Sequence, residues 1–346
     1  MSELLGAAMA RELAATPRVA EAQFAAAPEW AGALRALVPD DVRGVVVTAR
    51  GSSDHAAAYG RYVLEQALGV PAWSAAPSLI TRYGARTALD GVLALAVSQS
   101  GRTPEIVSVL ERQHAAGAVP LAITNDPVSP LAAAAALTIP LQAGEETAVP
   151  ATKTFTATLL AFALVAAALD YTGRFGVDAA QVVDALGATV QDGAATADVA
   201  ARISAADVSL HVGRGVLLPI AREAALKLVE TTATAHLAWS TVDVRHGPIA
   251  LATAGHPMLV QHAAGPVSRD AASLVRLLRE AGAPAWIVGE PLDGAAGVVA
   301  VPGGLPEHLR PLAHAVRLQQ IALATARVRG VDPDHPAGLS KVTATT

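Results

Sequence analysis

The stretch VLALAVSQSGRTPEIVSVLERQHAAGAVPLAIT, residues 92–124, contains the alternation that decides the fold of this chain. Its first part, VLALAVSQS at 92–100, begins as an apolar run typical of a strand buried on both faces of a parallel sheet. Pro104 and Gly117 then stand where a helix between them would begin and end. A second apolar run at 119–124 predicts the next strand. Strand, polar turn, helix and strand in this order indicate an α/β fold with a parallel sheet.

The same alternation continues on both sides of this stretch. Further strands are expected at 44–49, 137–141, 208–215, 256–265, 283–289 and 296–303. Long helices are expected after the turn at 50–53, through about Leu68, and at 152–171, 218–233, 268–282 and 311–330. Because the second half repeats the order of the first, the sequence predicts two doubly wound lobes, each with a parallel sheet flanked by helices.

The pattern also sets the expected domain boundaries. We expect a helical lead-in at 1–40 with breaks at Pro17, Pro28 and Pro39, since proline disrupts a helix interior. The remaining expected segments are a first domain at 41–172, a helical connector at 173–205, a second domain at 206–330 and a C-terminal tail at 331–346.

Composition excludes several classes of protein. Hydrophobic residues make up 52% of the 346 residues and charged residues 16%, which supports a large core and argues against disorder. The net charge of −5 without a dense basic run disfavours a nucleic-acid partner. The chain has no cysteine, so thiol catalysis and disulfides are excluded. No apolar run is long enough to span a bilayer and no signal pattern is present, so we expect a cytoplasmic protein with no membrane partner.

Two loops at predicted strand ends have the chemistry of a phosphate site. Hydroxyls and an amide crowd the loop before the helix at Pro104, and glycine there allows close approach of an anion to the helix N-terminus. The residues of this loop that we expect to bind are Ser98, Gln99, Ser100 and Thr103. Ser52 and Ser53 repeat the arrangement after the preceding strand. The alternative is that these side chains only cap helices.

The helix expected at 218–233 carries three charged residues on one face. Glu223, Lys227 and Glu230 are spaced i, i+4 and i+7, so their side chains are neighbours. A solvated salt-bridge stripe is the ordinary explanation for such spacing. The other face is rich in alanine and leucine, however, and the helix follows a glycine-rich strand end. A carboxylate beside a lysine at such a place can act in general acid–base chemistry and move protons at adjacent carbons of a substrate.

Two further residues are candidates for chemistry. His246 precedes Gly-Pro, whose tight turn would fix the imidazole, and histidine exchanges protons near neutral pH. Lys341 lies in the tail and is either a lysine of a flexible lid or part of a solvated end, and the sequence alone favours the solvated end.

Taken together, the motifs resemble one family. MARELAATP, SQSGRTPE, VPATKTFTATL, GRGVLLPIAREAALKLVE, VRHGP and GLSKVT occur in the order found in the sugar-isomerase (SIS) family, in the isomerase module of glucosamine-6-phosphate synthase and the stand-alone SIS-type glucosamine-6-phosphate deaminases. The resemblance covers essentially the whole chain. It implies tandem SIS domains and a sugar-phosphate substrate.

The resemblance also assigns roles to residues. It implies that Ser98, Gln99, Ser100 and Thr103 hold the sugar phosphate with help from Ser52, and that Ser53, Val149 and Ala151 line the sugar. It implies that Glu230 shuttles a proton between C1 and C2 with Lys227 beside it. In the family a partner subunit contributes the histidine that matches His246, which opens the ring, and a tail lysine that matches Lys341 reaches the open-chain sugar. A homodimer with shared active sites and no metal or other cofactor is therefore expected.

Departures from the family leave the exact reaction open. Without a cysteine nucleophile or a glutaminase domain in these residues, we expect an aldose–ketose isomerase and deaminase that acts on glucosamine 6-phosphate and uses or releases free ammonia. Leu237 stands where the family often has a carboxylate, and Pro150 lies beside the expected sugar pocket. These changes keep two alternatives open: a fructosamine-6-phosphate deglycase or other amino-sugar phosphate isomerase, and a non-catalytic sugar-phosphate sensor.

Overall fold

The computed structural model describes residues 4–283 and 285–341 and divides them into two compact units. The first-sheet unit is formed by residues 18–145 and 154–179. The second-sheet unit is formed by the residues up to 17, by 146–153 and by 180–341. Lys341 is thus described, whereas the rest of the expected C-terminal tail, 342–346, lies outside the described residues.

The first-sheet unit contains a five-stranded parallel sheet with the order β2-β1-β3-β4-β5. Its strands are β1 (Gly44–Thr48), β2 (Ala72–Ser74), β3 (Val92–Val97), β4 (Val119–Thr124) and β5 (Leu137–Pro140). Its helices are α2 (Thr16–Leu37), α3 (Ser52–Leu68), α4 (Pro77–Thr81), α5 (Pro104–Ala115), α6 (Pro130–Ala134) and α7 (Lys153–Leu169).

The second-sheet unit contains another five-stranded parallel sheet, with the order β10-β9-β8-β6-β7. Its strands are β6 (Val208–Gly213), β7 (Ala235–Ser240), β8 (Met258–His262), β9 (Ala285–Gly289) and β10 (Gly297–Val299). Its helices are α1 (Ala7–Ala14), α8 (Ala179–Gln191), α9 (Ala197–Ser204), α10 (Leu218–Thr232), α11 (Ser268–Glu280) and α12 (Arg310–Val328). Short 3₁₀ turns are η1 (Gly193–Thr196), η2 (Gly215–Leu217), η3 (Asp243–Arg245), η4 (Pro248–Leu251) and η5 (Glu307–Leu309).

The two sheets have the same topology. In each, the strand that comes first along the chain lies second from one edge, the next strand is at that edge, and the other three follow in order on the opposite side. This is the 2-1-3-4-5 order of a doubly wound sheet, in which ligands bind beyond the carboxyl ends of the strands. The prediction of two parallel α/β lobes is confirmed.

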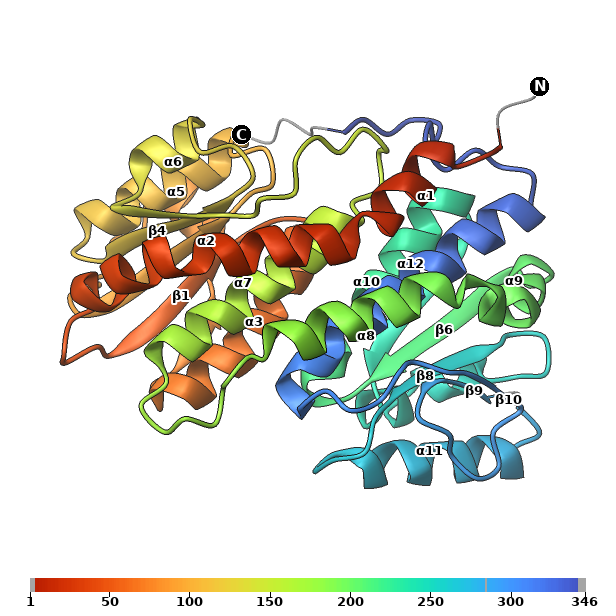
Figure 1. Cartoon of the computed structure of the whole chain (residues 1–346). Helices are drawn as coiled ribbons and strands as arrows, with labels where there is room; N and C mark the ends of the chain where they lie inside the picture. Colours follow the sequence, from red (N-terminus) through yellow and green to blue (C-terminus); the bar gives the residue numbers. More distant parts are fainter. Residues whose placement is uncertain (1–3, 284, 342–346) are drawn as a thin grey trace. The chain divides into compact units, whose positions relative to one another are not determined.

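Burial explains why the central strands read as continuous apolar runs. All six residues of β3 are buried, because alternate side chains enter cores on opposite faces of the sheet. Ala94 and Ala96 of β3 pack into the core that contains Ile106 and Leu110 of α5. On α3, a side chain at Gly60 would overlap the ring of Phe162 of α7, so these two helices meet closely (Figure 1).

The predicted helix break at Pro28 is wrong. Helix α2 runs through Pro28 without interruption, although proline removes one backbone donor and crowds the preceding turn. Tertiary packing outweighs this cost: Trp30 and Leu34 are buried, and the Gln23 side chain donates a hydrogen bond to the Ala157 carbonyl at 2.9 Å. The short strands β2 and β7 were not predicted.

Candidate functional site

The loop between β3 and α5 is shaped around Gly101. This residue has φ 62°, and a Cβ there would overlap the side chain of Ser129, so only glycine fits. The Gly101 amide donates to the Ser98 hydroxyl at 3.2 Å, and the Ser98 and Thr103 hydroxyls are 3.4 Å apart. Thr103 is the N-cap residue of α5, but its side chain makes no capping hydrogen bond. The capping alternative therefore fails for Thr103.

The second predicted phosphate loop lies at the same sheet edge. Ser52 and Ser53 form the first turn of α3, directly after β1, and β1 pairs with β3 in parallel. The carboxyl ends of neighbouring parallel strands meet at one edge, so the two loops are adjacent. An ion pair joins them, because Arg50 from the loop after β1 contacts Glu105 at the start of α5 at 2.9 Å.

The charged face of α10 is buried, which rules out the solvated-stripe explanation. The side chains of Glu223 and Lys227 are 0% and 1% exposed, and that of Glu230 is 21% exposed. The Lys227 ammonium lies 3.5 Å from Glu223 Oε1 and forms an ion pair with Glu230. Burying such charges is costly unless each has a partner. These residues are therefore a buried, paired group and not an ordinary solvated surface.

Burial and the charges of neighbouring side chains shift the pKa values in this group. Burial raises the pKa of Glu230 above its usual value; Lys227 acts in the opposite direction, and Glu223 adds to the rise. Burial alone would lower the pKa of Lys227, but the two carboxylates outweigh it and the pKa lies above its ordinary value. A lysine that stays charged beside a carboxylate with raised proton affinity is a suitable pair for general acid–base chemistry.

The tail brings a third ion pair to this region. The Lys341 ammonium lies 2.6 Å from Glu146 Oε2 and donates to the Ala148 carbonyl at 2.7 Å. The other Glu146 oxygen accepts hydrogen bonds from the Thr152 amide at 3.0 Å and hydroxyl at 3.2 Å. The Glu146 side chain is fully buried, whereas that of Lys341 is 23% exposed.

The ion pair of Lys341 and the two ion pairs of Lys227 influence one another within the second-sheet unit. Glu146 adds to the rise in the pKa of Lys227, and Lys341 opposes the rise in the pKa of Glu230. We call these residues the buried charge cluster, which consists of Glu146, Glu223, Lys227, Glu230 and Lys341. The structure therefore brings together three of the four predicted catalytic residues.

The remaining predicted residues are placed separately. His246 is exposed at the end of η3, and no hydrogen bond or ion pair joins its ring to the described residues of the cluster. Val149 and Ala151 are half-buried on either side of Pro150, in the segment that contains Glu146.

Across 4–283 and 285–341, no group of three or more His, Asp and Glu side chains is arranged to hold a metal ion. No described helix is both long and apolar enough to cross a membrane.

Comparison with known proteins identifies the family. The profile of the SIS domain matches residues 41–168. A candidate phosphosugar isomerase of Silicibacter pomeroyi DSS-3, known as a crystal structure, is 31% identical with a TM-score of 0.84, and the match covers 94% of this chain and 99% of that one. The chain belongs to the SIS-domain family.

Other SIS-domain relatives are longer proteins. Glutamine–fructose-6-phosphate aminotransferase (isomerizing) of Gloeobacter violaceus is 33% identical over 317 residues, which cover 87% of this chain and 52% of that protein. The chain thus spans about half the length of the curated relatives it matches. The C-terminal domain of glucosamine-fructose-6-phosphate aminotransferase from Francisella tularensis has the same fold, with a TM-score of 0.84, 22% identity and coverage of 95% and 98%.

Within this SIS-domain chain, sequence reasoning missed Glu146 and undervalued Glu223. One signal could have pointed to the cluster: the chain contains only three lysines, Lys153, Lys227 and Lys341. Arginine supplies nearly all its surface cations, whereas lysine is the cation whose proton affinity an enzyme site can tune. Two of the three lysines lie in the cluster, so their scarcity would have been a guide.

Proposed function

We propose that this SIS-domain protein interconverts glucosamine 6-phosphate and water with fructose 6-phosphate and ammonia, as a deaminase and aldose–ketose isomerase that uses free ammonia. The observation that carries the proposal is the buried charge cluster. It offers a carboxylate with raised pKa and two lysines within one unit, which are the groups that proton transfer at a sugar carbon requires.

Glu230 is the proposed proton carrier. In the open-chain amino sugar, the proton at C2 leaves to Glu230 and returns at C1, while the C1 oxygen gains a proton and the C2 amine loses one. The C1 aldehyde thus becomes a hydroxymethyl group and C2 becomes an imine. Water adds to the C2 imine, and ammonia leaves as the ketone forms. The side chain of Glu230 is 21% exposed and can therefore reach a substrate, while its burial raises its pKa.

The two lysines are the proposed electrostatic partners of this step. The reaction passes through an enediol-like species with negative charge developing on oxygen, and a fixed ammonium group stabilises that charge strongly in a water-poor site. Lys227 is held by Glu223 and Glu230, and Lys341 by Glu146.

The hydroxyl loops are the proposed phosphate anchors. Ser98, Ser100 and Thr103, with Gln99 and Ser52, offer donors beside the N-termini of α5 and α3, where an anion is favoured. Ser53, Val149 and Ala151 are the proposed sugar-lining residues.

The SIS profile matches only the first sheet, and the shared strand order supports the proposal that the second-sheet unit is a second SIS domain.

His246 is the proposed ring-opening residue, supplied by the partner in a homodimer. Its exposed position beside Gly247 and Pro248 leaves the imidazole available to a second copy. This role would explain why the ring has no bond to the described residues of its own chain's cluster.

One observation favours a second candidate function. Leu237 is 37% exposed on the edge strand β7, so an apolar side chain replaces the carboxylate that resembling proteins often carry there. A substrate with a substituted nitrogen, such as a fructosamine 6-phosphate, would suit this loss of charge. A non-catalytic sugar-phosphate sensor remains an outcome of the test below.

The proposal is tested by measuring ammonia released from glucosamine 6-phosphate by the purified chain, with fructosamine 6-phosphate and other amino-sugar phosphates in parallel. Glu230→Gln should abolish turnover and keep sugar-phosphate binding, and Glu280→Gln, an exposed residue at the end of α11, should change neither. Preference for another substrate would replace the proposed reaction. Binding without any turnover in the unmodified chain would leave only the sensor.

A further inference from the structure

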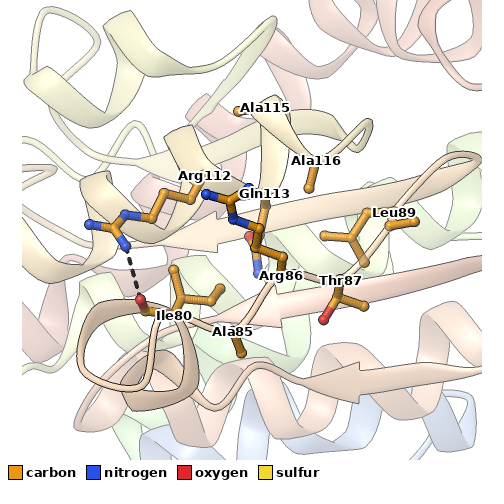
Figure 2. Close-up of a pocket in the computed structure, with 11 residues that line it drawn as sticks. Ile80, Ala85, Arg86, Thr87, Leu89, Arg112, Gln113, Ala115 and Ala116 are labelled. Carbon is orange, nitrogen blue, oxygen red and sulfur yellow. Dashed lines mark hydrogen bonds between the residues drawn. The ribbon is translucent and has the colours of Figure 1, made fainter.

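A cavity of about 660 Å³ lies in the first-sheet unit, away from the residues discussed so far. Ile80 of α4 and the loop 84–89 form one side, and the last turns of α5, from Arg112 to Ala116, form the other (Figure 2). This volume is in the range of pockets that bind small molecules. The feature is therefore large enough to be a ligand site.

The charge lining the cavity is entirely positive. Two arginines, Arg86 and Arg112, are among its eleven lining residues, and none of the eleven is acidic. Arg112 donates one hydrogen bond to the Ile80 carbonyl at 2.9 Å, which fixes its direction and leaves its other donors. In Figure 2 the Arg86 side chain extends from its loop toward α5. Arg86 forms no hydrogen bond or ion pair with the part of the chain that the structure describes.

The rest of the lining is suited to an organic ligand. Ile80, Leu89 and Ala116 supply apolar walls. The buried Gln113, next to Arg112 on α5, also lines the cavity, and its amide donates a hydrogen bond to the Thr48 hydroxyl at 3.3 Å. A ligand that pairs with two guanidinium groups and contacts these walls needs both an anionic end and an apolar body.

This cavity is separate from the proposed phosphate loops. None of the residues of those loops lines the cavity, and its Leu89 and Ala116 lie before the amino ends of β3 and β4. The loop from Ser98 to Thr103 lies beyond the carboxyl end of β3. One ligand bound at the loop would leave the cavity vacant for another.

We propose that this cavity binds a phosphorylated small molecule with an apolar portion, as a second ligand site of the chain. Arg86 and Arg112 pair with the phosphate, since the planar guanidinium group matches the spacing of phosphate oxygens. The charge-assisted hydrogen bonds that form are stronger than hydrogen bonds between neutral groups. Ile80 and Leu89 contact the organic part. The proposal does not depend on the reaction proposed above.

The test is calorimetric titration with phenyl phosphate, with inorganic phosphate and phenol as comparison probes. Arg86→Ala and Arg112→Ala should each weaken one binding event by roughly tenfold or more. Arg35→Ala, an exposed arginine of α2 outside the cavity, removes the same charge and should have no effect. The Ser98→Ala, Thr103→Ala double variant should keep this event.

Several results would overturn the proposal. Unchanged binding in both cavity variants, or an equal loss in Arg35→Ala, would show that no specific site exists there. Loss of the event in the Ser98→Ala, Thr103→Ala variant, with its fold checked by circular dichroism, would assign it to the loop instead. Binding of inorganic phosphate as tight as that of phenyl phosphate would remove the organic ligand from the proposal.

Discussion

At the scale of single residues, the ion pair of Glu146 and Lys341 is the contact at the end of the described tail, beyond the hydrogen bonds that join Asp332 and Asp334 to the start of α1. Breaking a buried ion pair costs several kcal/mol, but Lys341 is 23% exposed and solvent screens part of the interaction. We predict that a double-mutant cycle of Glu146→Gln and Lys341→Met gives a coupling of about 1–2 kcal/mol in urea unfolding. Proteolysis of the tail should also accelerate in both single variants.

The exposed pair of His335 and Asp332, 3.1 Å apart in the same tail, is the matched control. Because the His335 side chain is 86% exposed, its coupling should be close to zero. Equal couplings for the two pairs would show that Glu146 does not hold Lys341 specifically.

Buried imidazoles on the second sheet should make stability depend on pH. Burial lowers the pKa of His211 to about 3 and that of His236 to about 4, so both rings are neutral in the folded state. The Ser209 hydroxyl lies 2.9 Å from the His211 ring and 2.7 Å from the His236 ring. Protonation would cost this arrangement its acceptor nitrogens.

The sign follows from the unfolded state, where the pKa of a histidine is near its ordinary value of 6.5. Stability is fully present above that pH and is lost as the pH falls toward the folded-state values, since the unfolded chain then binds more protons. We predict a loss of about 2 kcal/mol per buried ring between pH 7 and 5. His211→Gln should flatten this part of the urea-unfolding profile, whereas His114→Gln, on the exposed side of α5, should leave it unchanged.

At the scale of elements, the contact between α3 and α7 depends on a missing side chain. Gly60 is inside α3, where alanine would normally be favoured, yet a Cβ there would overlap the Phe162 ring. We predict that Gly60→Ala destabilises the chain by about 1–3 kcal/mol, because the helices must separate. Gly32→Ala in α2, with nothing within 4 Å of its Cβ, should instead stabilise by about 0.5–1 kcal/mol. Denaturant midpoints of the two variants that shift in the same direction would contradict the packing argument.

The two sheets also show why only one of them resembles a phosphate site. In the first, β3 is followed by Ser98, Gln99 and Ser100; at the equivalent place in the second, β8 is followed by Ala263 and Ala264. Alanine has no hydroxyl donor. The strand order is the same in both sheets, but the hydroxyl side chains that we propose as phosphate ligands follow β3 and have no counterpart directly after β8.

Sequence patterns were sufficient for the long elements and insufficient for the short ones. β1, β3 and β4 are apolar because both faces are buried, so periodicity found them. β7 alternates exposed and buried residues along only part of its length, so its sequence shows no clear period of two. The persistence of α2 through Pro28 depends on packing against distant residues, which no local pattern contains.

At the scale of the whole molecule, the same limit applies to the site. The spacing of Glu223, Lys227 and Glu230 on one helix face could be predicted, because helical geometry is local. The partner of Lys341 could not, since Glu146 lies 195 residues away in sequence and only the fold joins them. Segment 146–153 belongs to the second-sheet unit although it lies between parts of the first, so chain order was a poor guide.

The last prediction concerns the assembly. If His246 acts in the site of a partner subunit, a His246→Ala chain keeps its own Glu230, and a Glu230→Gln chain keeps its own His246. Neither variant should turn over glucosamine 6-phosphate alone. After unfolding and refolding together in equal amounts, half the dimers should be mixed, and each would hold one complete site of two, so about a quarter of the unmodified activity should return. Refolding each variant separately before mixing is the control. No recovery in a mixture whose mixed dimers are verified by mass would place His246 outside the partner's site, because complementation requires the two groups to meet across the subunit boundary.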